Sequence, residues 1–304
     1  MKVCGVLPLL DVDRALFQRY RLYLAKSCTA YTAKILVSAQ ICILQRKAVT
    51  MYWRPGCAAD GTNCARLPRD AHLPDLQTVV PSHLNLVNQQ QREILRFSNG
   101  IANTGSGPLE LHPLSQNPKI FNDAQQNIYN AQTAAAGSLV CHRPLTEVFF
   151  FHPEHNHWHL DDVALFEVRH AADDGTGGRW GRVFGNSVKQ TFCLIDWVPI
   201  NDAKPGSRVY GACFGDQGIS IDWVDQYHHS TEFQDVEITD APEGIYYLVS
   251  TVNADKIFLE SNYANNVAWV SFELLRDSNG NRKIARLISH STCTGDLCGY
   301  STNR

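Results

Sequence analysis

The distribution of apolar residues predicts short β-strands over most of the chain from residue 73 onwards. Apolar, aromatic and β-branched side chains come in short runs, and clusters of glycine, proline, asparagine and aspartate separate them. Turns at such regular spacing are typical of an antiparallel β-sandwich with long loops. The strands that we expect cover residues 93–97, 109–111, 149–168, 183–195, 233–238, 245–252, 267–275 and 283–288.

Two stretches lack this pattern. Residues 123–136 are polar and rich in alanine, which favours a loop or a short helix. Residues 1–71 are unassigned and partly helical in character, and their apolar run at 35–44 has the length of an export-signal core or a buried helix. This segment is either a leader or sequence upstream of the true start. We therefore predict an N-terminal segment over 1–71 and one all-β domain over 72–304.

Composition and charge exclude several classes of function. The formal net charge is −3 and no basic stripe is present, which argues against binding to nucleic acid. No run approaches the roughly 18 apolar residues of a membrane span. The ten cysteines include no paired CxxC motifs of the zinc-ribbon type. We expect disulfides instead, in a secreted or extracytoplasmic protein.

Three histidines at alternating positions are the strongest chemical signal. His155, His157 and His159 lie in a stretch whose apolar flanks favour a strand, so their side chains are expected on one face. Imidazole binds zinc, copper, iron and nickel, and three such ligands leave a coordination position open, as in catalytic sites. A solvated histidine face is the alternative. His152, just upstream, is a candidate supporting residue.

Several short motifs occur in one order between residues 73 and 295, and the order is far more specific than any single motif. They are LPDL at 73–76, REILRF at 92–97 followed by NTG at 103–105, HNHWH at 155–159, KQTFCL at 189–194, GIS at 218–220 leading to DQY at 225–227, ITDAPEGIY at 238–246 and ESNYANNV at 260–267. Together they resemble the catalytic domain of the lysyl oxidase family, in the form of a stand-alone domain like those of bacterial or archaeal members.

The resemblance implies a copper amine oxidase. Copper would be held by His155, His157 and His159, and Lys189 and Tyr227 would be joined as the built-in cofactor lysine tyrosylquinone. Such an enzyme uses dioxygen to convert primary amines, either peptidyl lysine or small amines, to aldehydes, and releases hydrogen peroxide and ammonia. The partners implied are the amine and dioxygen, with no nucleic acid and no membrane span.

The resemblance also implies a calcium site, and the sequence offers candidates for a catalytic base. Asp225, His228 and His229 are candidate bases because they lie next to Tyr227 in the sequence. Asn262 stands where the family commonly has aspartate, which weakens the expected hold on the ion, and a hydrogen-bonded turn is the alternative. The possible calcium ligands are Asp75, the backbone carbonyl of Leu76, Glu260, Asn262, Asn265 and Asn266.

One departure from the family pattern leaves a disulfide open. Glu154 occupies the position before the first histidine, where the family often has cysteine, so Cys213 pairs with either Cys193 or Cys141. Two other functions compete with the oxidase. One is a non-catalytic β-sandwich that holds copper or zinc and calcium as an adhesion or binding module. The other is a histidine-metal hydrolase, against which the absence of an HExxH motif argues.

Overall fold

The computed structural model describes residues 64, 67–89, 91–115, 121–133, 135–172, 179–186, 190–201, 206–232 and 234–299. The prediction for residues 1–71 falls almost wholly outside these ranges. Within them the secondary structure is β apart from one 3-10 turn, η1 at Gly295–Cys298, which confirms the all-β class. No helix of the described part is long and apolar enough to cross a membrane.

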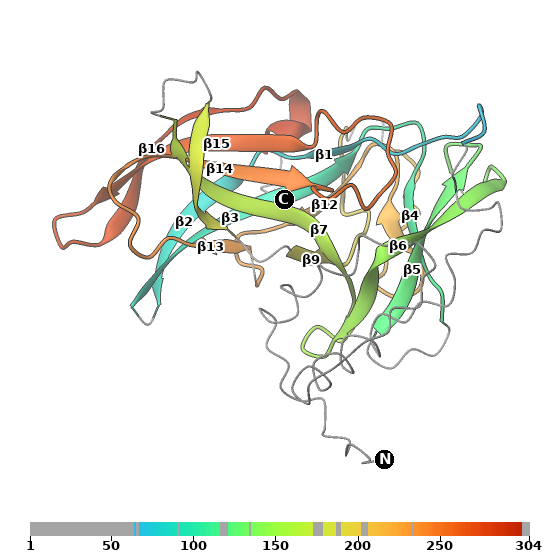
Figure 1. The fold of residues 1–304 in the computed structure, drawn as a ribbon, viewed down its shortest axis with the longest axis horizontal. Helices are drawn as coiled ribbons and strands as arrows, with labels where there is room; N and C mark the ends of the chain where they lie inside the picture. Colours follow the sequence, from blue (N-terminus) through green and yellow to red (C-terminus); the bar gives the residue numbers. More distant parts are fainter. Residues whose placement is uncertain are drawn as a thin grey trace, which may run out of the picture. The chain divides into compact units, whose positions relative to one another are not determined.

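The described strands form two sheets, and every pairing within them is antiparallel (Figure 1). The larger sheet has the order β11 (Gln217–Ile219), β4 (Leu109–Pro113), β5 (Phe121–Tyr129), β6 (Leu139–His152), β7 (His157–Ala171), β14 (Gly244–Val252), β15 (Val267–Arg276) and β16 (Arg282–His290), with β8 (Trp180–Asn186) and β9 (Gln190–Phe192) also paired to β7. The smaller sheet has the order β1 (Leu76–Thr78), β3 (Arg92–Asn103), β12 (Trp223–Tyr227) and β10 (Val198–Pro199), with β2 (Ser82–Gln89) and β13 (Asp235–Glu237) also on β3.

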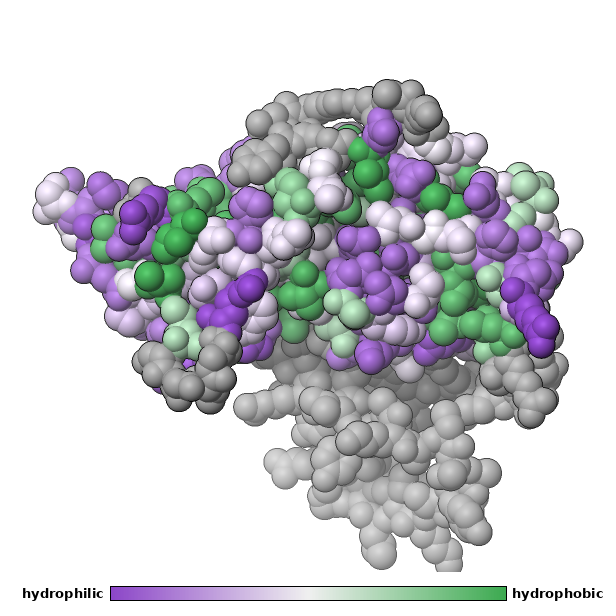
Figure 2. All heavy atoms as spheres, turned by 90° about the horizontal axis from the view of Figure 1, so that it is seen from above, coloured by the Kyte–Doolittle hydropathy of each residue, from purple (hydrophilic) through white to green (hydrophobic). Residues whose placement is uncertain are grey.

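The hydrophobic core lies between strands of the two sheets. Phe97 of β3 packs edge-on against Phe166 of β7, with ring centroids 4.8 Å apart, and both side chains are fully buried. In β14, Tyr246 and Leu248 are buried while Ile245 is exposed, which is the alternation expected of a strand with one face in water. Accordingly, small hydrophobic groups are interspersed with hydrophilic ones on the face drawn in Figure 2.

Most of the predicted strands are confirmed. Those at 93–97, 109–111, 245–252, 267–275 and 283–288 lie within β3, β4, β14, β15 and β16, and β13 lies within 233–238. The strand expected at 183–195 is instead two strands, β8 and β9. Residues 187–189 between them lie outside the described ranges.

The expectation of a loop or helix at 123–136 is wrong for its first half, because β5 runs through it. Asn122, Gln126 and Asn127 of β5 are buried and hydrogen-bonded, so their polarity does not prevent strand formation. Gln126 donates to the carbonyl of Leu259 at 2.8 Å and accepts from its amide at 2.7 Å. Asn127 donates to the carboxylate of Glu110 at 2.9 Å. A hydropathy pattern does not detect a strand whose polar groups are satisfied in this way.

The single strand expected at 149–168 is a hairpin. β6 ends at His152, residues 153–156 form a turn, and β7 begins at His157. Asn156 adopts a left-handed conformation with φ of 54°, which asparagine tolerates better than most residues. His155 therefore lies in the turn, and the strand-alternation argument fails for it, although it holds for His157 and His159.

Three disulfides link described residues: Cys64–Cys141, Cys193–Cys213 and Cys293–Cys298. The open alternative for Cys213 is thereby resolved in favour of Cys193. The Cys64–Cys141 bridge spans 77 residues and ties the start of the described chain to β6. Disulfide formation, as expected from the cysteine spacing, is confirmed for these three pairs.

The contact between Phe97 and Phe166 should be a main source of cohesion between the sheets. We expect Phe166→Ala to lower the free energy of unfolding by about 3–5 kcal/mol, because it removes a buried ring and leaves a cavity. Urea denaturation measures this loss. The control Leu287→Ala removes a side chain that is 56% exposed and should change stability by no more than about 0.5 kcal/mol. Equal losses in the two variants would contradict this account of the core.

Candidate metal centre

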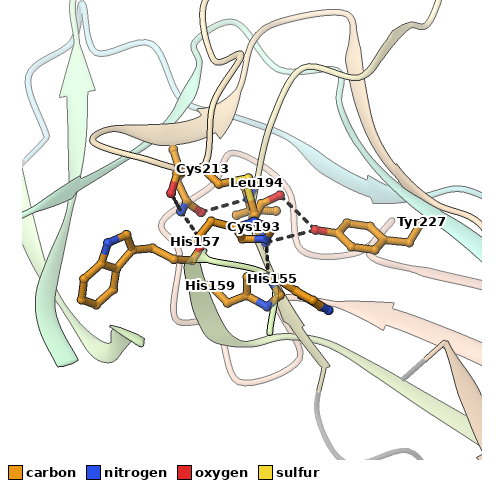
Figure 3. Close-up of a disulfide and its surroundings, with 9 residues drawn as sticks. His155, His157, His159, Cys193, Leu194, Cys213 and Tyr227 are labelled. Carbon is orange, nitrogen blue, oxygen red and sulfur yellow. Dashed lines mark hydrogen bonds between the residues drawn. A yellow bond between two sulfur atoms is a disulfide. The ribbon is translucent and has the colours of Figure 1, made fainter. Parts of the chain in front are cut away.

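The three predicted histidines converge on one point. Their ligand nitrogens all lie within 4.8 Å of one another. Nε2 of His157 is 2.8 Å from Nε2 of His159, which is in turn 3.4 Å from Nδ1 of His155. Figure 3 shows the three rings grouped beside the Cys193–Cys213 disulfide. Three imidazole nitrogens at this spacing fit a single transition-metal ion with an open coordination position.

The β6–β7 hairpin positions these rings. His152 and Phe150 of β6 pair with His157 and His159 of β7. Because neighbouring residues of a strand face opposite ways, Trp158 points away from the cluster and packs edge-on against Phe151, with ring centroids 5.4 Å apart. His155 reaches the cluster from the turn instead.

His152 supports the cluster, as the sequence suggested. Its ring stacks on that of His155 with centroids 4.1 Å apart and an interplanar angle of 17°. It also lies 5.2 Å from the ring of His159. Stacking of this kind limits the rotation of the His155 ring, which has no strand geometry to hold it. His152 thus restrains the candidate ligand that the turn contributes.

The environment of His157 favours its neutral form. Burial lowers the pKa of His157, and the neighbouring His155 and His152 lower it further. A lowered pKa favours the neutral imidazole, whose lone pair is what a metal ion needs. The cluster should therefore retain this ligand at a pH where an ordinary exposed histidine is already protonated.

Tyr227 faces the same pocket as the histidines. The pocket has a volume of about 440 Å³, and its lining includes the three histidines, Tyr227 and the Cys193–Cys213 disulfide. The hydroxyl of Tyr227 donates to the carbonyl of Cys193 and accepts from its amide, both at 3.0 Å (Figure 3). Burial, followed by the charge of Asp225, raises the pKa of Tyr227 well above its ordinary value. The phenol is thus neutral, and the two hydrogen bonds to Cys193 fix the orientation of its hydroxyl group.

Only one of the three candidate bases lines this pocket. Asp225 is 2% exposed, accepts from the amide of Ile195, and its Oδ2 has no hydrogen-bond partner among the described residues. Burial is the largest cause of its raised pKa, and the charge of Asp196 adds to it. The structure thus places in the pocket a carboxyl group with an uncommitted oxygen.

His228 and His229 do not line the pocket. Their rings lie 4.0 Å apart and gather instead around His83, at centroid distances of 5.6 and 5.9 Å. β12 ends at Tyr227, so His228 and His229 lie beyond the strand, and of the three residues that the sequence offered only Asp225 lines the pocket.

Lys189, the other predicted cofactor residue, lies outside the described residues. The described chain resumes at Gln190, which pairs with Ala164 of β7. Phe192, three residues after Lys189 in the sequence, packs edge-on against Tyr227 with ring centroids 4.4 Å apart. Phe192 and Cys193 of the KQTFCL motif thus lie against the tyrosine that the resemblance names as its partner.

Glu232 and Trp197 are among the residues of the pocket that sequence reasoning missed. A carboxylate oxygen of Glu232 lies 3.6 Å from Nε2 of His155, and the Trp197 side chain is 56% exposed. The only signal for Glu232 is its position five residues after Tyr227. No sequence pattern indicates Trp197, because its place depends on how the loop before β10 crosses the pocket.

The predicted calcium ligands are partly brought together. Glu260, which is 3% exposed, accepts from the amide of Leu76 at 2.8 Å and from Asn266 at 2.7 Å. Asn265 donates to the carboxylate of Asp75 at 3.0 Å. The Oδ1 atoms of Asn265 and Asn266 have no hydrogen-bond partner within the described ranges. Unused oxygens beside two carboxylates are a donor set that fits a hard cation.

Asn262 stands apart from this group. It is exposed, and its Oδ1 accepts from the amide of Ala264 at 3.0 Å, which closes a local turn. The turn that was the alternative to a calcium site is thus present at this residue. It does not account for the free oxygens of the neighbouring asparagines.

The fold and the pocket define a class: an all-β protein with two antiparallel sheets and a candidate three-histidine metal centre beside a partly buried tyrosine. The sequence profile described as lysyl oxidase matches residues 124–280, about half of the chain and all of this pocket's described lining. The chain therefore belongs to the lysyl oxidase family.

Individual relatives are matched over shorter stretches. Lysyl oxidase homolog 2 of Homo sapiens and of Pongo abelii is 38% identical over 79 residues, which is 26% of this chain and 10% of each relative. The protein of the same name from Xenopus laevis is 31% identical over 127 residues, which is 41% of this chain and 15% of the relative. The matches thus span between 10% and 15% of these relatives' own length.

The histidine cluster should bind one transition-metal ion. We expect His159→Gln to weaken the binding of Cu²⁺ by about 100-fold or more, because loss of a direct ligand should cost at least as much as loss of an outer-shell partner. Isothermal titration of the disulfide-intact protein measures this affinity. His112→Gln is the matched control, since His112 lies outside the cluster and pairs with Asp216. Unchanged binding by His159→Gln would exclude the cluster as the metal site.

Proposed function

We propose that this protein is a copper-dependent oxidase of primary amines that uses a lysine tyrosylquinone formed from Lys189 and Tyr227. The overall reaction converts an amine, dioxygen and water to an aldehyde, hydrogen peroxide and ammonia. One observation carries the proposal: three convergent imidazoles and the hydroxyl end of a partly buried tyrosine at the motif position face one pocket. Family membership supports an amine oxidase of this general type.

Each residue of the pocket has a role in this proposal. When present, copper and dioxygen would supply the oxidation of the phenol, and the quinone would supply an electrophilic carbonyl and take up two electrons from the amine. His155, His157 and His159 hold the metal. The backbone of Cys193 holds the Tyr227 hydroxyl, and the edge of Phe192 limits the movement of the tyrosine ring.

Asp225 is the base that we propose for removal of a proton from the α-carbon of the substrate. Its Oδ2 has no competing hydrogen bond in the described part of the chain, and it lines the pocket. Its pKa is raised by burial, so the carboxylate is a stronger proton acceptor than an ordinary aspartate. Unlike His228 and His229, it is inside the pocket.

The rim of the pocket suits a cationic substrate. Glu232 is exposed at the pocket and can attract the ammonium form of an amine, and the exposed face of Trp197 can contact it through a cation–π interaction. Both peptidyl lysine and small amines present this ammonium group. We also propose an extracytoplasmic location, because three disulfides persist best in an oxidising compartment.

The quinone is tested with phenylhydrazine after copper loading in air. We expect the protein to give a coloured adduct and Tyr227→Phe to give none, because the phenol that becomes the quinone is missing. Tyr247→Phe is the matched control, since this tyrosine lies on β14 and outside the pocket. Peptide mass spectrometry should find Lys189 and Tyr227 covalently joined.

An adduct that survives in Tyr227→Phe would refute the assignment of the cofactor. If the protein binds copper but gives no adduct and no cross-linked peptide, the oxidase proposal fails. The non-catalytic metal-binding module would then be the better description. Formation of hydrogen peroxide with a primary amine, absent in Tyr227→Phe, completes the test.

We further propose that Asp75, the Leu76 carbonyl, Glu260, Asn265 and Asn266 bind Ca²⁺, with Asn262 contributing less. Burial raises the pKa of Glu260, so the folded state loses stability as the pH rises and this carboxyl group ionises. A bound cation would offset that loss. Calcium should therefore raise the thermal midpoint, and more at pH 8 than at pH 5.

Glu260→Gln should abolish this calcium effect, because it removes the buried negative charge. Asn279→Ala, an exposed asparagine in the β15–β16 hairpin, should retain it. Differential scanning calorimetry with and without millimolar calcium measures both. A calcium effect that persists in Glu260→Gln would place the ion elsewhere.

A further inference from the structure

A second set of metal ligands overlaps the histidine cluster. The ligand nitrogen of His157 and the sulfur atoms of Cys193 and Cys213 all lie within 4.8 Å of one another. In the structure the two sulfurs are joined as a disulfide, and Figure 3 shows the bridge directly beside the His157 ring. His157 therefore belongs to two donor sets, one made of nitrogens and one that contains two sulfurs.

The oxidation state of the sulfurs decides whether the second set can bind a metal. A disulfide is a poor ligand, whereas two thiolates are strong ligands for zinc and cuprous ions. Reduction by a dithiol adds two electrons and two protons to the bridge, and the dithiol becomes a disulfide. Both thiols then release their protons as the metal binds.

We propose that reduction of Cys193–Cys213 creates a binding site for zinc or a cuprous ion from the two thiolates and His157. A fourth position would be left for water or another donor, because zinc is commonly four-coordinate. His157 would then bind the ion held by the two thiolates and would no longer be a ligand in the nitrogen cluster. The protein would thus hold a harder ion on its histidines when oxidised and a softer ion on its sulfurs when reduced.

The backbone on both sides of the bridge is anchored independently of the sulfur–sulfur bond. The carbonyl of Cys213 accepts from the amide of Trp158, the residue after His157, at 3.3 Å. The amide and carbonyl of Cys193 are both hydrogen-bonded to the hydroxyl of Tyr227. Breaking the bridge therefore leaves both cysteines beside the ring of His157.

The distances suit a shared ion. The Cα atoms of the two cysteines are 5.4 Å apart. Zinc–sulfur bonds of about 2.3 Å in a tetrahedron separate two sulfurs by about 3.7 Å, which side-chain rotation from this backbone spacing can provide. Both cysteines line the 440 Å³ pocket; Cys193 is 2% exposed and Cys213 is half-buried, so a reductant reaches the bridge from the side of Cys213.

The consequence for amine oxidation rests on the proposed function, but the thiolate site itself does not. If the histidines hold the catalytic copper, reduction removes one of its three ligands. It also frees the sulfur of the residue whose backbone orients Tyr227. Reduction would then stop activity by rearranging the metal site, with no need to unfold the domain.

Cobalt(II) is the probe for this site, because cobalt bound to thiolate has an intense near-ultraviolet charge-transfer band. The full chain is reduced anaerobically with a phosphine, which becomes the phosphine oxide, and is then titrated with Co²⁺. Because the chain has ten cysteines, paired variants are required. We expect Cys193→Ser with Cys213→Ser to lose one equivalent of the band, and Cys293→Ser with Cys298→Ser to keep it.

Two histidine variants test the shared ligand without altering any cysteine. In the reduced protein, His157→Gln should weaken cobalt binding tenfold or more, whereas His155→Gln should leave both the affinity and the band unchanged. In the oxidised protein both variants should weaken binding, because both residues belong to the nitrogen cluster. Circular dichroism of each reduced variant checks that the β structure is retained.

Two results would overturn the proposal. One is a full band in the Cys193→Ser, Cys213→Ser protein, which would assign the thiolates to other cysteines. The other is equal weakening by His155→Gln and His157→Gln after reduction, which would mean that the nitrogen cluster still holds the ion. Absence of the quinone would affect neither result, since the assay needs no dioxygen and no amine.

Discussion

The pairing of β6 with β7 across the turn at 153–156 is the interaction on which the candidate site depends. It sets the register in which His152 faces His157 and Phe150 faces His159. A shift of one residue would turn His157 and His159 to the face that Trp158 now occupies and would separate them from the pocket. Burial of Phe149 and Leu160, which also pair across the hairpin, specifies the observed register.

The second constraint is the place where β12 of the smaller sheet meets the pocket. β12 pairs with β3, and its last three residues, Asp225, Gln226 and Tyr227, all line the pocket. The Cys193–Cys213 bridge and the main chain of Cys193 then connect Tyr227 to the strand that carries the histidines. Metal ligands and tyrosine therefore come from different sheets, and the packing of Phe97 on Phe166 keeps those sheets together.

The sequence predicted what local patterns can encode. Strands with alternating or continuous apolar residues, such as β14 and β15, were recognisable, and so was the histidine motif. Three features depended on distant residues and were not. β5 is a strand because Glu110 and Leu259 satisfy its polar side chains. His155 joins the cluster through a turn. Asp225 could be distinguished from His228 only when the structure showed which of the two lines the pocket.

Both candidate cation sites have the same energetic signature. In each, several atoms that could bind a cation lie close together, and hydrogen bonds do not satisfy all of them. At the histidine cluster, ring nitrogens at 2.8 Å can share only one proton between them without repulsion. At the other site, burial and the charge of Asp75 raise the pKa of Glu260 while two amide oxygens stay unpaired.

Such arrangements are unfavourable in a protein that binds nothing, because desolvated donors and acceptors without partners destabilise the folded state. A cation at either position would remove this destabilisation, because the atoms that repel one another would become its ligands. The same reasoning separates these two clusters from the group of His83, His228 and His229. There Ser98 bridges the ring of His83 and the amide of His229, and Ser230 engages His228, so ordinary hydrogen bonds already account for the arrangement.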